Sequence, residues 1–234
     1  PTYMKLLIAL AAALVVASTV SSHGQDLSFG LTGSSSLLST GVSRTYTSNG
    51  VTMTATAFSY TGGSNSSFFE AARLGRYSSG LGVTNRFENG SDPGHRVDNY
   101  QYNDYILFTF DTLVDVESIK IASIIDDSDV SYWLGNINTN TVAGKTYSGL
   151  ASLGFQGEQI DMINASISSR TVNINSPTTG VNAILFGAQK GLDSGRTLDQ
   201  FKVHTLKASV VIPEPSTALL SLLGVIGVCF RRRR

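Results

Sequence analysis

The sequence predicts an all-β fold, an antiparallel β-sandwich of the jelly-roll type, with an apolar segment at each end of the chain. Two observations predict the sandwich. Short segments rich in β-branched and aromatic residues follow one another between loops of Gly, Ser and Asn. In addition, no long stretch between the apolar ends has the 3.6-residue period of an amphipathic helix.

The strands are expected where apolar residues alternate or run together. Val51–Tyr60 alternates small apolar residues with Thr, which is typical of a half-buried strand. Tyr105–Phe110 is almost wholly apolar, which predicts a central strand buried on both faces. Phe68–Leu74 fits a strand or a single helical turn. Further strands are expected at Val130–Leu134, Glu158–Ile163, Thr171–Asn175, Val181–Ala188 and Gln200–Leu206.

The alternation between Val114 and Ile125 changes parity once. Val114 and Val116 are apolar at even positions, whereas Ile119 and Ile121 are apolar at odd ones. Since successive side chains of a strand point to opposite faces, such a slip requires a bulge or tight turn. We expect it near Glu117–Ser118.

The N-terminal segment has the order of a secretory signal peptide. Lys5 precedes the apolar stretch Leu6–Ala17, and small residues such as Ser21 and Ser22 follow. We expect residues 1–24 to be the signal peptide, with 1–3 upstream of the true start. An N-terminal membrane anchor is the alternative.

The C-terminal segment has three parts. The stiff tripeptide Pro213, Glu214 and Pro215 comes first, and the uncharged run Ala218–Phe230 follows. Thirteen helical residues span about 20 Å, less than the ~30 Å bilayer core, so Ser216 and Thr217 would extend the predicted transmembrane helix. A buried core helix is the alternative. Four permanent charges end the chain: Arg231, Arg232, Arg233 and Arg234.

This tripartite tail resembles the PEP-CTERM sorting signal. The resemblance implies recognition by exosortase, a membrane-embedded cysteine protease of Gram-negative bacteria. It also implies processing near the tripeptide, after a stage in which the helix lies in the membrane, and sorting to the cell surface or the exopolysaccharide matrix. Residues 210–234 are therefore expected to be a sorting and anchoring segment, and residues 25–209 the β-sandwich domain.

Short segments between residues 45 and 217 are similar to exosortase-dependent surface proteins. The resemblance implies a β-rich secreted domain tethered through the tail, with no activity to carry over. The segments are Ala72–Tyr77, Gly80–Asn85, His95–Asn99, Leu107–Phe110, Asp127–Ser131, Leu185–Ala188 and Asp199–Lys202.

Net charge and cysteine content exclude several classes of function for the chain between the two apolar ends, called the body below. Residues 25–215 contain 12 basic and 17 acidic residues, a net charge of −5, which opposes nucleic-acid binding because that needs a basic footprint. The only cysteine, Cys229, lies in the tail. The body therefore has no disulfide, no thiol nucleophile and no cysteine metal site.

Three aspartates within four residues make a candidate metal site. Asp126, Asp127 and Asp129 could supply oxygen ligands to Ca²⁺, although the spacing is not that of an EF-hand. Asp92, Asp98 and Asp104 could join from a neighbouring loop. A solvated turn is the alternative, because Asp favours turns through its side-chain hydrogen bonds.

A possible sugar-binding residue and two catalytic arrangements complete the candidates. Trp133, the only tryptophan, could stack on a sugar or belong to the core; it cannot share a face with its neighbour Tyr132. His95, Asp98 and Ser91 could be written as a triad, but the chain has no nucleophile elbow. A glycosidase pair would have to come from Glu70, Glu88 and Glu158.

We therefore expect a non-enzymatic structural or adhesive protein of the cell surface or matrix, in contact with exopolysaccharide. A calcium-dependent carbohydrate-binding module and an extracellular hydrolase are the alternatives.

Overall fold

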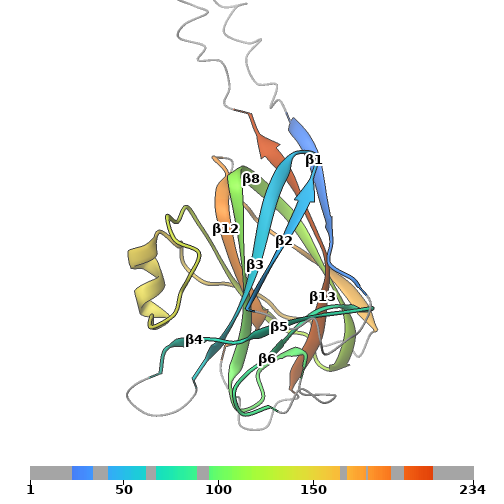
Figure 1. Ribbon diagram of the computed structural model, residues 1–234, viewed down its shortest axis with the longest axis vertical. Helices are drawn as coiled ribbons and strands as arrows, with labels where there is room; N and C mark the ends of the chain where they lie inside the picture. Colours follow the sequence, from blue (N-terminus) through green and yellow to red (C-terminus); the bar gives the residue numbers. More distant parts are fainter. Residues whose placement is uncertain are drawn as a thin grey trace, which may run out of the picture. The chain divides into compact units, whose positions relative to one another are not determined.

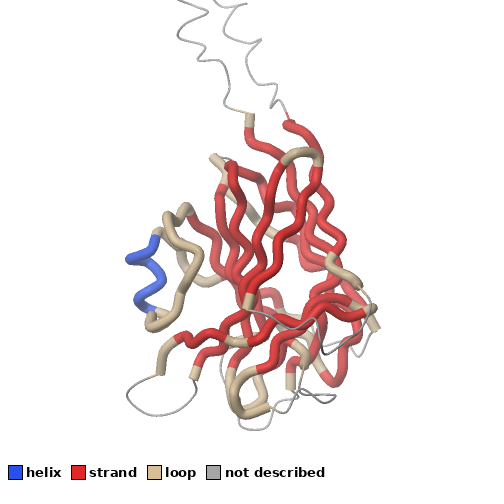
Figure 2. Tube along the Cα trace, in the orientation of Figure 1, coloured by secondary structure: helices blue, strands red, loops and turns tan. Residues whose placement is uncertain are grey.

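In the computed structural model the described residues are 23–33, 42–61, 67–88, 95–163, 168–177, 179–190 and 198–212. Most of the described residues lie in strands, and one short helix, η2, lies to one side (Figure 2). The strands are β1 (His23–Gly30), β2 (Ser43–Ser48), β3 (Val51–Tyr60), β4 (Phe69–Ala71), β5 (Arg73–Tyr77), β6 (Gly80–Thr84), β7 (Val97–Asp98), β8 (Asn103–Asp126), β9 (Val130–Gly135), β10 (Gln159–Asp161), β11 (Ser169–Asn173), β12 (Val181–Ala188) and β13 (Asp199–Val211). The 3₁₀ helix η2 is Ser148–Leu153.

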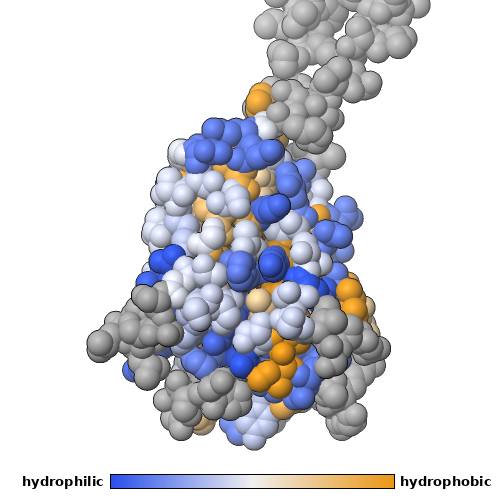
Figure 3. Space-filling model, turned by 90° about the vertical axis from the view of Figure 1, so that its right-hand side faces the viewer, coloured by the Kyte–Doolittle hydropathy of each residue, from blue (hydrophilic) through white to orange (hydrophobic). Residues whose placement is uncertain are grey.

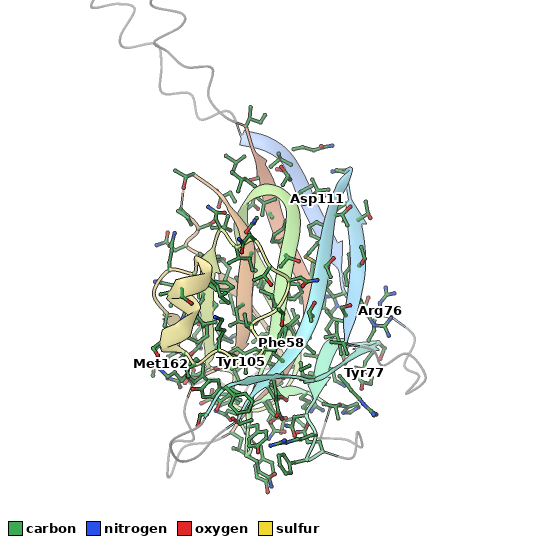
Figure 4. All side chains as sticks on the ribbon, turned by 60° about the vertical axis from the view of Figure 1, so that its left-hand side comes forward. Phe58, Arg76, Tyr77, Tyr105, Asp111 and Met162 are labelled. Atoms are coloured by element: carbon green, nitrogen blue, oxygen red, sulfur yellow. The ribbon has the colours of Figure 1, made fainter. Side chains whose placement is uncertain are left out.

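The long strand β8 belongs to both layers of the sandwich. Its first limb, residues 103–110, pairs with β3 on one side and β12 on the other. Its second limb, residues 114–126, pairs with β13 and β11. Between the limbs the strand turns over as an arch, near Asp111 in Figure 4. The 13 strands of the described residues thus form one hydrogen-bonded sheet that folds at β8 into two layers (Figure 1).

The main core lies between the two layers. Every second side chain of the first β8 limb, Ile106, Phe108 and Phe110, points into it, as does every second side chain of β3. Val203 and Leu206 of β13 contribute from the other layer. Burial of this apolar surface is the main stabilising contribution in a body without disulfides.

A second core covers the outer face of the first layer, the layer formed by the first β8 limb with β3 and β12. Tyr105 and Leu107 alternate with the main-core residues of β8 and point to this side. Residues 136–157, which include η2, cover them with Leu150 and Phe155. Figure 4 shows Phe58 and Tyr105 on this side of the sandwich, toward η2. The first limb of β8 is therefore buried on both faces, which confirms the prediction for Tyr105–Phe110.

The predicted bulge is present. Ser118 pairs with Lys207 and Val116 pairs with Ala208, so Glu117 is an extra residue opposite no partner. Because of this residue, Val116 and Ile119 both point into the main core although they differ in parity.

Most expected strands occur at or near their predicted bounds. Val51–Tyr60 and Val181–Ala188 coincide with β3 and β12. Phe68–Leu74 is a strand region rather than a helical turn, since it contains β4 and the start of β5. Strand β13 extends to Val211, two residues past the expected end of the sandwich domain.

The apolar ends fall largely outside the described residues. Residues 1–22 and 213–234, which hold most of the predicted signal peptide, the tripeptide, the predicted helix and the terminal arginines, are not described. Within the part that is described, no helix is both long enough and apolar enough to span a bilayer. The face drawn in Figure 3 is mainly hydrophilic, with hydrophobic side chains most visible toward its lower end.

Candidate functional site

Buried carboxylates gather at the end of the sandwich opposite the β8 arch. The first limb of β8 begins there at Asn103, and the second limb ends there at Asp126. Strand β13 begins at the same end with Asp199, which pairs with Asp126, and runs to the arch end, where Val210 pairs with Val114. The sheet therefore brings acidic residues from distant parts of the sequence to one end.

The first cluster consists of Asp127, Asp129 and Asp199. One carboxylate oxygen from each lies within 4.8 Å of the others. Two of the three aspartates predicted as calcium ligands thus come together, and the third member comes from β13. Asp126 is not part of the cluster; its Oδ2 accepts a hydrogen bond from Gln200 Nε2 at 3.4 Å.

Each carboxylate of this first cluster accepts at least one hydrogen bond. Asp199 accepts one from the backbone N–H of Asp129 at 2.7 Å and one from Asn99 Nδ2 at 2.8 Å. Asp129 Oδ1 accepts one from the backbone N–H of Ile163 at 2.8 Å. Asp127 Oδ1 accepts one from Ser128 N–H, also at 2.8 Å. These hydrogen bonds therefore connect the start of β13 to the residue after β7, and the loop before β9 to the segment after β10.

Burial dominates the electrostatics of the first cluster. It raises the pKa of Asp199 to about 7, and the charges of Asp129 and Asp127 act in the same direction against the hydrogen bonds that lower it. In the loop itself Asp127, Ser128 and Asp129 are buried and only Asp126 is exposed, which differs from the fully solvated turn expected as the alternative. Calcium ligation by Asp126, Asp127 and Asp129 stays a prediction.

The second cluster consists of Glu88, Asp98 and Asp104, whose carboxylate oxygens, one from each, also lie within 4.8 Å of one another. Asp98 and Asp104 had been expected as partners of the Asp126–Asp129 loop, but they meet Glu88 instead. Asp92 is outside the described residues. Burial raises the pKa of Asp98 to about 8, with the Glu88 charge adding to it. Burial also raises the pKa of Asp104 well above its usual range, and the charges of Asp98 and Glu88 act in the same direction.

The contacts of the second cluster leave one oxygen unused. Ser59 Oγ donates to Asp104 Oδ1, Tyr100 N–H donates to Asp98 Oδ1 at 2.9 Å, and Asn85 N–H donates to Glu88 Oε2 at 2.8 Å. Asp104 is 0% exposed, yet no group among the described residues donates a hydrogen bond to its Oδ2. The Asn85 amide lies close enough to lower the Asp104 pKa, but its Nδ2 likewise reaches no acceptor in hydrogen-bond geometry.

One arginine lies near each cluster. The Arg96 charge lowers the pKa of Asp98, while its Nη1 donates to Ser123 Oγ at 2.8 Å. Arg170 donates to Ser128 Oγ at 3.0 Å and pairs with Asp161 at 2.7 Å. Each cluster thus holds three acids, and its nearby arginine is shared with other acceptors.

Trp133, the predicted sugar-binding residue, lies in the second core. It is 4% exposed and stacks on Tyr147, with ring centroids 5.6 Å apart. Its neighbour Tyr132 points to the main core, as the strand alternation predicted. A ring buried in this way presents no face for a sugar, so of the two alternatives the geometry favours the core role.

The residues of the two catalytic alternatives have other partners. Glu70 pairs with Arg86 at 3.2 Å, and Glu158 pairs with Lys190 at 3.6 Å. The His95 ring packs edge-on against Tyr77, with centroids 4.4 Å apart, and Ser91 lies outside the described residues. A pocket of the described residues lies elsewhere, and its lining contains no carboxylate, histidine, lysine or thiol; the lining residues are Leu134, Gln156, Gly157, Gln159, Asn175, Ser176 and Pro177.

Comparison with known proteins identifies the tail. Residues 211–234 match the PEP-CTERM protein-sorting motif, which confirms the resemblance for this segment. The motif implies export, processing by exosortase and attachment to the cell surface. No curated protein and no solved structure matches the chain.

Proposed function

We propose that this chain is an exosortase-processed protein of the cell surface or exopolysaccharide matrix, and that its sandwich has a structural or adhesive role without catalysis. The observation that carries the proposal is the continuity of β13 with the sorting motif. Strand β13 pairs with β8 along its length and ends at Val211, the first residue of the match. The last strand of the sandwich therefore runs up to the first residue of the sorting motif.

The position of the carboxylates supports the same function. The chain leaves the sandwich at the arch end, whereas both carboxylate clusters lie at the opposite end. The carboxylate end is therefore the end of the sandwich opposite Val211, the residue at which the sorting motif begins.

The test is surface display in a Gram-negative host with and without its exosortase. We expect the full chain to reach the cell surface in a shortened form only when the protease is present. Replacing Pro213, Glu214 and Pro215 together by Ala should leave it full-length in the membrane fraction. Pro177→Ala, outside the motif, is the control and should behave as wild type. Equal display of the triple variant would overturn the proposal.

Glycan binding is the second candidate, favoured by exposed aromatic rings next to the second cluster. Phe87 is 57% exposed and Tyr100 is 53% exposed. The Phe87 and Tyr102 rings meet edge-on with centroids 4.8 Å apart, and the Arg86 guanidinium lies 4.8 Å from the Phe87 centroid. Such rings provide the apolar faces on which sugars stack, a role that the buried Trp133 cannot fill.

This second candidate is tested by co-sedimentation with exopolysaccharide from the host. Phe87→Ala and Tyr100→Ala should each reduce the bound fraction several-fold. Ile160→Ala removes a similarly exposed apolar side chain from β10 and should leave binding unchanged. Equal binding of all three variants and the wild type would rule out the aromatic surface as the glycan site.

A further inference from the structure

We propose that Glu88, Asp98 and Asp104 bind a divalent cation of the calcium class at the end of the sandwich opposite the arch. The site is distinct from the predicted loop Asp126–Asp129 and does not depend on the function proposed above. Its members come from three places in the chain: the segment after β6, strand β7 and the start of β8.

The separations of the oxygens fit a single ion. Ca²⁺ binds oxygens at about 2.3–2.6 Å, so two ligands on opposite sides of it lie about 4.6–5.2 Å apart. The oxygens of the three carboxylates lie within 4.8 Å of one another. All three can therefore contact one calcium ion. The smaller Mg²⁺, with ligands at about 2.0–2.1 Å, would require the oxygens to move closer together.

The unused oxygen of Asp104 is the second observation that points to a ligand. Asp104 is completely buried, and its Oδ1 is held by Ser59 while its Oδ2 accepts no hydrogen bond among the described groups. Leaving a buried acceptor without a partner is costly, and a carboxylate oxygen is the ligand that calcium prefers. A cation in the cluster would give this oxygen its missing partner.

The first cluster lacks this feature. Both oxygens of Asp199 accept hydrogen bonds, from Asp129 N–H and from Asn99 Nδ2. A cation there would have to compete with donors that are already in place. The two clusters, similar in composition, are thus predicted to differ in metal binding, and each serves as the control for the other.

Charge balance favours the same assignment. Three carboxyl groups bring one oxygen each to within 4.8 Å of one another, and two of the three residues, Asp98 and Asp104, are buried. A divalent cation among them would offset two of the three negative charges of the ionised cluster.

The test uses the full chain in mild detergent, stripped of cations with a chelator and titrated with CaCl₂ at pH 7.5. We expect saturable binding of one ion and a rise of the melting temperature by about 5 °C at a hundredfold excess over Kd. Asp98→Asn and Asp104→Asn should weaken binding by about tenfold or more. Asp129→Asn, the matched change in the first cluster, should bind as wild type.

A second readout keeps the proposal testable if a variant folds poorly. Terbium replaces calcium in oxygen sites, and Tyr100 next to Asp98 is placed to sensitise its emission. We expect wild-type emission that saturates with one Tb³⁺ and is displaced by CaCl₂. Absence of this emission, or calcium binding that is lost in Asp129→Asn but retained in Asp104→Asn, would overturn the proposal.

Discussion

Asn99 and Asp199 exchange two hydrogen bonds across 100 residues of sequence. Asn99 Nδ2 donates to Asp199 Oδ2 at 2.8 Å, and the Asp199 backbone N–H donates to Asn99 Oδ1 at 3.0 Å. Both residues are buried, and Asp98, the preceding residue, belongs to the second carboxylate cluster. Asn99 therefore links the two clusters at the end of the sandwich.

Replacing Asn99 should destabilise the fold markedly. Asn99→Ala leaves a buried N–H and a buried carboxylate oxygen without these partners, and each such loss costs about 1–3 kcal/mol. We expect the free energy of unfolding in urea to fall by about 2–4 kcal/mol. Asn138→Ala, in an exposed loop, is the control and should change stability little. Equal stability of the two variants would contradict the bridging role.

Asp199 should make the stability depend on pH. Its pKa rises to about 7 in the folded state because of burial, so the folded protein holds a proton that the unfolded chain releases near pH 4. Stability should therefore fall as pH rises from about 4 to about 7 and then level off. With a chelator present, the titration of Asp199 should lower the free energy of unfolding by about 2–3 kcal/mol between pH 5 and pH 8.

The measurement is urea unfolding at several pH values, for the wild type and for Asp199→Asn. The variant has no proton to release at this position, so its stability should fall less between pH 5 and pH 8. Glu117→Gln removes an exposed carboxylate and should keep the wild-type profile. A profile of Asp199→Asn that parallels the wild type would show that another group is responsible.

The sequence predicts where most strands lie, but it does not predict how they pair or that β8 is one continuous strand. Local alternation predicts β3 and β12 at their observed bounds, and the parity change predicts the bulge at Glu117. It does not show that Tyr105–Phe110 and the segment up to Ile125 form one strand that crosses between layers. That depends on pairing with β3, β12 and β13, which are distant in sequence.

The carboxylate clusters show the same limit. Asp127 and Asp129 could be paired from sequence because they are two residues apart. Asp199 is 70 residues from Asp129, and no local pattern connects them. Glu88, Asp98 and Asp104 fall within 17 residues, but only the folding of β7 and β8 onto neighbouring strands brings their oxygens together. The only sign of this cluster in the sequence is that several acidic residues, separated by other residues, precede the buried strand Tyr105–Phe110.

Gly187 should be difficult to replace, because β12 leaves no space there for a side chain. A Cβ at this position would overlap the Asp104 carbonyl oxygen and the Tyr105 ring. Gly187→Ala should therefore lower the free energy of unfolding by about 1–3 kcal/mol. Gly157→Ala places a methyl group in open space and should be close to neutral in the same urea titration. Neutral behaviour of Gly187→Ala would mean that the β8–β12 contact is looser than described.

Trp133 allows a direct test of the second core, because it is the only tryptophan in the chain. Its ring is 4% exposed and packs against Tyr105 and Tyr147. Iodide should therefore quench the native fluorescence weakly and quench it strongly after unfolding in urea. In a Trp133→Phe background, Phe87→Trp places the reporter at a 57% exposed position and should be strongly quenched in the native state. If the wild-type protein were quenched as strongly as this control, residues 136–157 would not cover the first layer, and Trp133 would again be a candidate for sugar binding.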